Sequence, residues 1–112
     1  MSEDNKKVIR DFISYLNSDT IKYSFNNGGW SYDSKVYDFI SCCYENDIVL
    51  KYDNIEERKE LQKKDIDEMS KIELKKYLFV LFNGERFCSG MIMQSIKSGK
   101  LSLILNKILN MF

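Results

Sequence analysis

The stretch that decides the fold is SKIELKKYLFVLF, residues 70–82. It begins with Ser70 and Glu73, the spacing of a capping box, in which each side chain accepts a hydrogen bond from the backbone N–H of the other residue. From Tyr77 to Phe82 every residue is apolar. Such a run predicts a helix that ends near Phe82 and is covered on all sides at the centre of the fold. A buried strand is the alternative, but the cap and the length favour a helix.

Further helices are predicted on both sides of this stretch. Apolar residues recur at helical spacing in four segments: residues 5–16, 34–45, 86–97 and 100–111. Residues 54–64 are almost all polar and predict a solvated, marginal helix. Residues 48–52 predict a short extended segment. The fold class is therefore mainly α, a compact bundle of five or six short helices.

The segment from residue 21 to residue 32 has a different pattern. Apolar and polar residues alternate up to Phe25, the turn sequence Asn-Asn-Gly-Gly follows at 26–29, and Trp30 and Tyr32 come after it. Alternation on both sides of an Asn/Gly turn is typical of a β-hairpin. We expect a small hairpin near 21–32, with an aromatic-rich loop as the alternative.

The composition restricts the chemistry. The 112 residues, enough for a single domain over 1–112, hold 17 basic and 17 acidic side chains, no His and no Pro. Without His there is no Ser–His–acid triad and no His-based metal site. The three cysteines form no Cys-x-x-Cys pair, and no glycine-rich phosphate loop is present. We therefore expect no metal, no cofactor and no enzymatic activity.

The cellular setting is inferred from the same composition. The polar start is unlike a signal peptide, and no apolar run has the roughly 18 residues that a membrane span needs. An odd number of cysteines gives no disulfide framework, so we expect a cytoplasmic protein without membrane contact. Lys, Asn, Ile, Tyr and Phe are abundant while Ala is absent, a bias typical of an A/T-rich genome. We expect a low-GC bacterium, or a phage or plasmid that lives in one.

The segment Glu85-Arg86-Phe87-Cys88 is the sharpest local feature. In a functional interpretation, Arg86 binds a carboxylate or phosphate at a helix start, and Cys88 is an activated thiol. In the structural interpretation, which we favour, Glu85 caps the next helix, Arg86 pairs internally, and Phe87 and Cys88 fill the core.

A family resemblance rests on this segment. The stretches in question are Gly84–Gly90, Ile96–Leu101, Leu105–Leu109, Tyr32–Ile40 and Ile48–Asp53. Together they resemble a family of small prokaryotic proteins of unknown function, whose members carry a Glu-Arg-Phe-Cys-acid-Gly box before a Gly-bounded helix pair. The resemblance implies a small, mostly helical domain and a home in bacteria or their mobile elements, but no activity.

The chain departs from this family pattern at three positions. Ser89 stands where the box usually has an acid, Asn54 where a Trp is frequent, and Met91 near a frequent His. If the family has a catalytic acid or histidine there, this chain lacks it.

Aromatic residues around the predicted turn are candidates for binding. Trp30, Tyr32 and Phe25 suit a partner anchor or a platform for stacked bases, and an aromatic lid over the core is the alternative. With Arg86 they are the candidate partner-binding residues.

Charged and apolar surfaces supply the other candidates. Residues 83–112 hold 4 basic and 1 acidic side chains, and Lys97, Lys100 and Lys107 form a thin basic edge. The acids of residues 56–68 lie among lysines, which favours a solvated helix surface over a metal site.

The apolar stripe of the C-terminal helix is expected in the core, and a homodimer through this helix is the alternative.

From these patterns we expect a small cytosolic protein-interaction module, in the form of an inhibitor or accessory protein of a phage or mobile element. The second interpretation is a nucleic-acid-binding or processing protein that uses the basic C-terminal third. The third is an enzyme built on Cys88 and Arg86.

Overall fold

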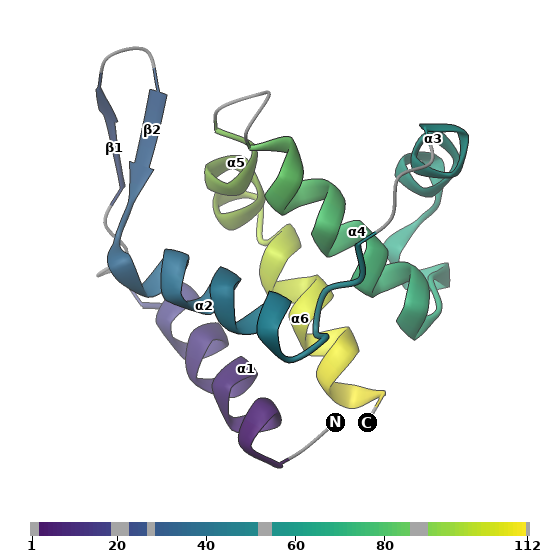
Figure 1. Cartoon of the computed structure of the whole chain (residues 1–112), viewed down its shortest axis with the longest axis horizontal. Coiled ribbons are helices and arrows are strands. Elements are labelled where there is room, and N and C mark those ends of the chain that lie inside the picture. Colours follow the sequence, from purple (N-terminus) through teal and green to yellow (C-terminus); the bar gives the residue numbers. More distant parts are fainter. Residues whose placement is uncertain (1–2, 19–22, 27–28, 52–54, 86–89, 112) are drawn as a thin grey trace.

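The computed structural model describes residues 3–18, 23–26, 29–51, 55–85 and 90–111. Within these ranges the chain forms six α-helices, one 3₁₀ turn and a two-stranded antiparallel hairpin (Figure 1). In chain order they are α1 (Glu3–Leu16), β1 (Tyr23–Asn26), β2 (Gly29–Tyr32), α2 (Ser34–Glu45), α3 (Ile55–Lys63), η1 (Ile66–Glu68), α4 (Lys71–Gly84), α5 (Met91–Lys97) and α6 (Lys100–Asn110). The mainly-α prediction is confirmed, and residues 23–32 contain the hairpin rather than a loop.

Helix α4 lies at the centre, as its sequence predicts. The N–H of Glu73 donates to Ser70 Oγ at 3.2 Å, and the N–H of Ser70 donates to Glu73 Oε1 at 3.0 Å, so the capping box is formed. Five residues of its apolar half are buried: Tyr77, Leu78, Val80, Leu81 and Phe82. The helix packs against α3, α5 and α6.

Helix α6 supplies the most deeply buried stripe. Leu101, Ile104, Leu105 and Ile108 are each at most 1% exposed. They lie where α6 contacts α1, α4 and α5 (Figure 1). The stripe is therefore part of the core, and a homodimer through this helix would have to use its outer face, where Leu103 is 44% exposed.

Helix α2 lies across α1 on the surface of the bundle. Asp33 caps it, because Asp33 Oδ1 accepts a hydrogen bond from the N–H of Lys35 at 3.0 Å. Its buried residues are Val36, Phe39 and Cys43. The ring of Phe39 stacks on that of Phe12 from α1, with the centroids 3.8 Å apart.

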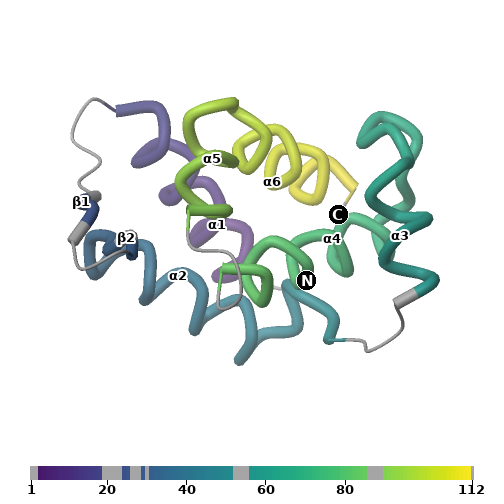
Figure 2. The backbone as a smooth tube through the Cα atoms, turned by 90° about the horizontal axis from the view of Figure 1, so that it is seen from above, coloured from purple at the N-terminus to yellow at the C-terminus, as the bar shows by residue number. Residues whose placement is uncertain are grey.

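Helix α3 is solvated, as its polar sequence predicts. Leu61 is buried at 4% exposure. Two ion pairs connect the α3 region to α4, Lys76 with Glu57 and Lys64 with Glu73. Such exposed pairs contribute little, about 0–1 kcal/mol each. In Figure 2 the helix lies at the opposite end of the molecule from the hairpin.

The prediction of an extended segment over residues 48–52 is wrong at Ile48 and Val49. The chain turns after α2, with Asp47 at a φ of 56°. The N–H groups of Ile48 and Val49 both donate to the carbonyl of Cys43. Ile48 and Val49 are buried at 0% and 4% exposure, so their hydrophobicity reflects burial of a turn rather than pairing in a sheet.

The predicted start of the helix over residues 86–97 is also wrong. Helix α5 begins at Met91, and Gly90 before it has a φ of 101°. A helix cannot continue through a residue in the left-handed region, so the glycine separates α5 from whatever precedes it. Residues 86–89 lie outside the described ranges.

All six helices contribute to one cluster of buried apolar side chains. The radius of gyration of the Cα atoms is 13.6 Å. A compact chain of this length is expected near 13 Å, so the helices enclose the core without a separate lobe.

Candidate functional site

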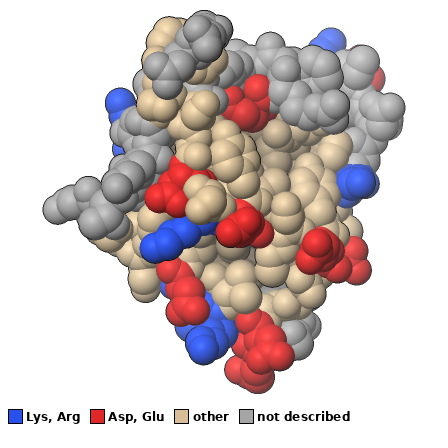
Figure 3. Space-filling model, turned by 60° about the vertical axis from the view of Figure 1, so that its left-hand side comes forward, with Lys and Arg blue, Asp and Glu red and all other residues tan. Residues whose placement is uncertain are grey.

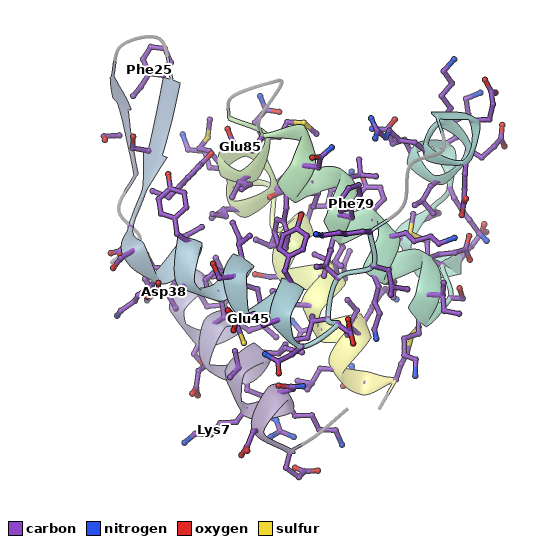
Figure 4. All side chains as sticks on the ribbon, viewed as in Figure 1. Lys7, Phe25, Asp38, Glu45, Phe79 and Glu85 are labelled. Carbon is purple, nitrogen blue, oxygen red and sulfur yellow. The ribbon has the colours of Figure 1, made fainter. Side chains whose placement is uncertain are left out.

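The candidate residues of the hairpin lie in different environments. Phe25 on β1 is 58% exposed, near the tip of the hairpin (Figure 4). Its partner in the antiparallel register is Trp30. The side chain of Trp30 and the whole of Arg86 lie outside the described residues. Phe25 is therefore the hairpin candidate whose side chain the structure shows to be exposed.

Tyr32 is a positioning residue rather than a contact residue. It is 8% exposed, its hydroxyl donates to Glu85 Oε1 at 2.5 Å, and the hydroxyl accepts from the N–H of Met93 at 3.0 Å. Burial, and then the hydrogen bond to Glu85, raise the pKa of the Tyr32 phenol. Both the ring and the hydroxyl of Tyr32 are used inside the protein, so its role in binding a partner stays a prediction.

Glu85 links the end of α4 to the start of α5. Its Oε2 accepts a hydrogen bond from the N–H of Gly90 at 2.5 Å, and its Oε1 accepts from the N–H of Ile92 at 2.9 Å. The first N–H groups of a helix have no partner within the helix, and a carboxylate satisfies them while it also interacts favourably with the helix dipole. The prediction that Glu85 caps the next helix is confirmed. The roles predicted for Arg86, Phe87 and Cys88 lie outside the described residues.

A groove of about 630 Å³ runs between α2 and α4, and we call it the aromatic groove. Its walls are Tyr37, Ile40 and Tyr44 from α2 together with Phe79 and Phe82 from α4. Tyr37 is 48% exposed, and Ile40, Tyr44 and Phe79 are partly buried. The side chains of two helices thus present an apolar, ring-lined surface that the described chain does not cover.

Opposite charges stand at the two ends of the aromatic groove. At one end, Lys51 Nζ lies 5.2 Å from the centroid of the Tyr44 ring. At the other end is Glu85, next to Tyr37, because the Tyr37 hydroxyl accepts from the N–H of Tyr32, whose own hydroxyl binds Glu85. Among the described residues, neither Lys51 nor Glu85 belongs to an ion pair. The hydrogen bonds to Glu85 come from neutral groups, so within the described ranges no opposite charge offsets either the carboxylate or the Lys51 ammonium.

A family model described as a family of unknown function, DUF6508, matches residues 9–112. The chain belongs to DUF6508. This confirms the resemblance to a family without an assigned function, and the matched range includes the hairpin and both ends of the aromatic groove. No curated protein and no solved structure is similar enough to count as a match.

The DUF6508 chain has a second hollow, of about 450 Å³, on the other side of α2. The stacked rings of Phe12 and Phe39 belong to its lining, and Asp11, Lys35 and Asp38 are charged residues around it. In Figure 3, where the left-hand side of Figure 1 comes forward, acidic and basic side chains are both spread around an uncharged surface. Helix α2 is thus a ridge with a hollow on each side.

The basic edge of this family member does not form a collected patch. Lys100 Nζ lies 5.0 Å from the centroid of the Tyr77 ring, and Lys107 Nζ pairs with Asp67 Oδ1 at 2.8 Å. These contacts direct two of the three predicted lysines toward the protein's own side chains.

Cysteines and carboxylates give no second chemical centre in the described part of the chain. Cys43 is 0% exposed, and burial raises the pKa of its thiol, which keeps it protonated. Within the described ranges, no three His, Cys, Asp or Glu side chains are grouped so that they could hold a metal ion.

In the same ranges, no helix combines the length and the apolar character that crossing a bilayer requires.

Sequence reasoning missed the residues of the groove. The apolar spacing over residues 34–45 does not single out Tyr37, and Phe79 belongs to the run over residues 77–82 that is predicted to be covered on all sides. The structure leaves Tyr37 half exposed and Phe79 partly buried. A usable signal was present: α4 is apolar all round, so any side that no other helix covers becomes an apolar surface.

Proposed function

We propose that this DUF6508 protein is a protein-interaction module, which binds a partner protein through the aromatic groove and acts by binding rather than by catalysis. The observation that carries the proposal is the groove itself, an open surface lined by four aromatic rings. Tyrosine is enriched among the residues that dominate binding energy at protein interfaces. An exposed apolar surface of this kind is typical of an interaction site.

The hairpin supports the same interpretation. Phe25 is the most exposed of the large apolar side chains that the structure describes. The base of the hairpin is attached through Tyr32 to Glu85, at one end of the aromatic groove. A partner seated in the groove can therefore extend toward the hairpin and cover Phe25.

The proposed setting is the cytosol of a low-GC bacterium, where the protein serves as an inhibitor or accessory protein of a phage or mobile element. Two observations support this setting. Cys42 and Cys43 are free thiols, which suits a reducing compartment. The composition is rich in residues with A/T-rich codons. A gene embedded in a chromosomal metabolic operon, far from any prophage, would contradict the mobile-element part.

Site-specific photocrosslinking in the cells that naturally carry the gene tests the binding function. A benzophenone amino acid replaces Tyr37 in the groove in one experiment and Leu103 on the outer face of α6 in a matched control. We expect a covalent adduct with a particular cellular protein from the groove position and not from the α6 position. Equal labelling at both positions, or no adduct at the groove, refutes binding through the groove.

A further inference from the structure

We infer that the occupant of the aromatic groove is an amphipathic helix of the partner, about two turns of it in contact, with its N-terminal end toward Glu85 and its C-terminal end toward Lys51. This inference rests on the proposed function and names the partner chemistry of the same site. The observation behind it is the juxtaposition of an apolar groove between two helices with opposite charges at its ends, neither of which is in an ion pair with another described residue.

The dimensions of the groove match two turns of helix. Tyr37, Ile40 and Tyr44 are at positions i, i+3 and i+7 of α2, so they lie along one face. At about 1.5 Å per residue, Tyr37 and Tyr44 are separated by about 10 Å along the helix axis. A partner helix that places apolar residues at i, i+3 or i+4, and i+7 presents anchors over the same length.

The backbone of the walls favours a helix over an extended peptide. Both walls are α-helices, whose backbone N–H and C=O groups are bonded within the helix. The two helical walls offer an extended peptide no sheet edge to pair with, so its backbone groups would remain unsatisfied where these walls bury them. In a helix the backbone N–H and C=O groups are hydrogen-bonded to each other, so only the side chains of a helical partner would contact the rings of the groove.

The charges at the two ends of the groove determine the direction in which the partner helix lies. The first turn of a helix carries a partial positive charge and the last turn a partial negative charge. The carboxylate of Glu85 therefore favours the N-terminal end and basic side chains near it, while Lys51 favours the C-terminal end and acidic side chains. Among the described residues, no cation pairs with Glu85 and no carboxylate pairs with Lys51 to offset this preference.

Two display libraries of peptides of about 16 residues, long enough for an isolated helix to form, test the inference. One library is built on a helix-favouring frame, and the other carries a central Pro that prevents a helix. Both are selected against the full chain and counter-selected against the Asn83→Trp variant, which fills the groove with a larger side chain. We expect enrichment from the helical library alone, with apolar residues at helical spacing, basic residues in the first turn and acidic residues in the last.

The enriched peptide is then measured by fluorescence anisotropy. Phe79→Ala is expected to weaken binding by about ten-fold or more, since it removes an aromatic wall. Lys51→Glu is expected to weaken it by roughly three- to ten-fold, and a peptide with basic residues in its last turn should restore the loss. Leu103→Ala, on the outer face of α6, is the matched control and should leave binding unchanged. Circular dichroism confirms that each variant is folded.

Three results would overturn the inference: no peptide that distinguishes the chain from Asn83→Trp, enrichment from the Pro library instead, or acidic residues in the first turn of the selected helices. If any of these occurs while the crosslink from position 37 still captures a cellular protein, the binding function stands and only the helical partner is refuted. Loss of both the peptide and the crosslink refutes the two together.

Discussion

Replacing Tyr32 by Phe removes a single hydroxyl group that connects three parts of the chain. That hydroxyl donates to Glu85 Oε1 at 2.5 Å and accepts from the N–H of Met93 at 3.0 Å. It thereby joins the end of β2 to the end of α4 and to the first turn of α5. The Tyr32→Phe variant keeps the ring and its packing, so its effect reports on the hydrogen bonds.

The expected loss of stability in Tyr32→Phe follows from the two hydrogen bonds of the Tyr32 hydroxyl. A hydrogen bond to a charged group contributes about 1.5–3 kcal/mol, and a buried N–H that loses its acceptor costs about 1–3 kcal/mol. Because one hydroxyl serves both, the two costs overlap. We expect Tyr32→Phe to lower the free energy of unfolding by about 2–4 kcal/mol, a large share of the stability of a small domain.

Urea unfolding at pH 7, followed by circular dichroism, measures this loss. With an m-value of about 2 kcal/mol/M, in the middle of the usual range, the midpoint should fall by about 1–2 M. Tyr37→Phe is the matched control, since that hydroxyl accepts one bond, from the N–H of Tyr32 at 3.2 Å, on a side chain 48% exposed. The control should lose less than about 1 kcal/mol. A Tyr32→Phe loss no greater than that of the control would refute the reasoning.

Three further measurements check the fold. Leu81→Ala should cost about 2–5 kcal/mol in urea unfolding by leaving a cavity beside α4, and a result as small as that of the exposed Leu103→Ala would show that α4 is not central. Gly99→Ala should cost about 1 kcal/mol from backbone strain alone, because the glycine has a φ of 80° and an added Cβ meets nothing within 4 Å; a gain in stability would contradict this. Burial raises the pKa of both the Cys43 thiol and the Tyr32 phenol, so each group holds its proton more tightly in the folded state. The contribution of the Cys43 thiol to the free energy of unfolding should be fully present below about pH 8.5, where the thiol is protonated in both the folded and the unfolded state. Above about pH 8.5 the free energy of unfolding should fall by about 1.4 kcal/mol per pH unit, and Tyr32 should add to the fall above about pH 10. Urea midpoints that stay level in this range, or that fall equally in Cys43→Ala, would contradict the assignment to this thiol.

Most helices could be predicted because their signals are local. The Ser70–Glu73 capping box marks the start of α4, and the α2 range predicted from apolar spacing, residues 34–45, agrees with the observed Ser34–Glu45. Gly99, at a positive φ, marks the boundary between α5 and α6. Each of these features depends on residues within one turn of the boundary, so no tertiary information is needed to find it.

The two errors have a common physical cause. Hydrophobicity reports burial but not the backbone geometry that achieves it, so the apolar Ile48 and Val49 were assigned to an extended segment although they lie in a buried turn. The start of α5 was placed too early for a related reason. The apolar residues before Gly90 suited a helix, whereas the left-handed φ of that glycine is a feature of the folded backbone.

Composition and periodicity were enough to establish a mainly helical chain without imidazole chemistry, with α4 and α6 in its core. The aromatic groove and the Tyr32–Glu85 contact could not be predicted in this way, because they depend on how the helices pack. Tyr32 and Glu85 are 53 residues apart, and the aromatic groove exists because α2 lies beside α4 without covering Phe79. Local propensity carries no information on how two helices are spaced, since that spacing results from the side chains of the whole core. The groove and its charged ends therefore became visible only in three dimensions.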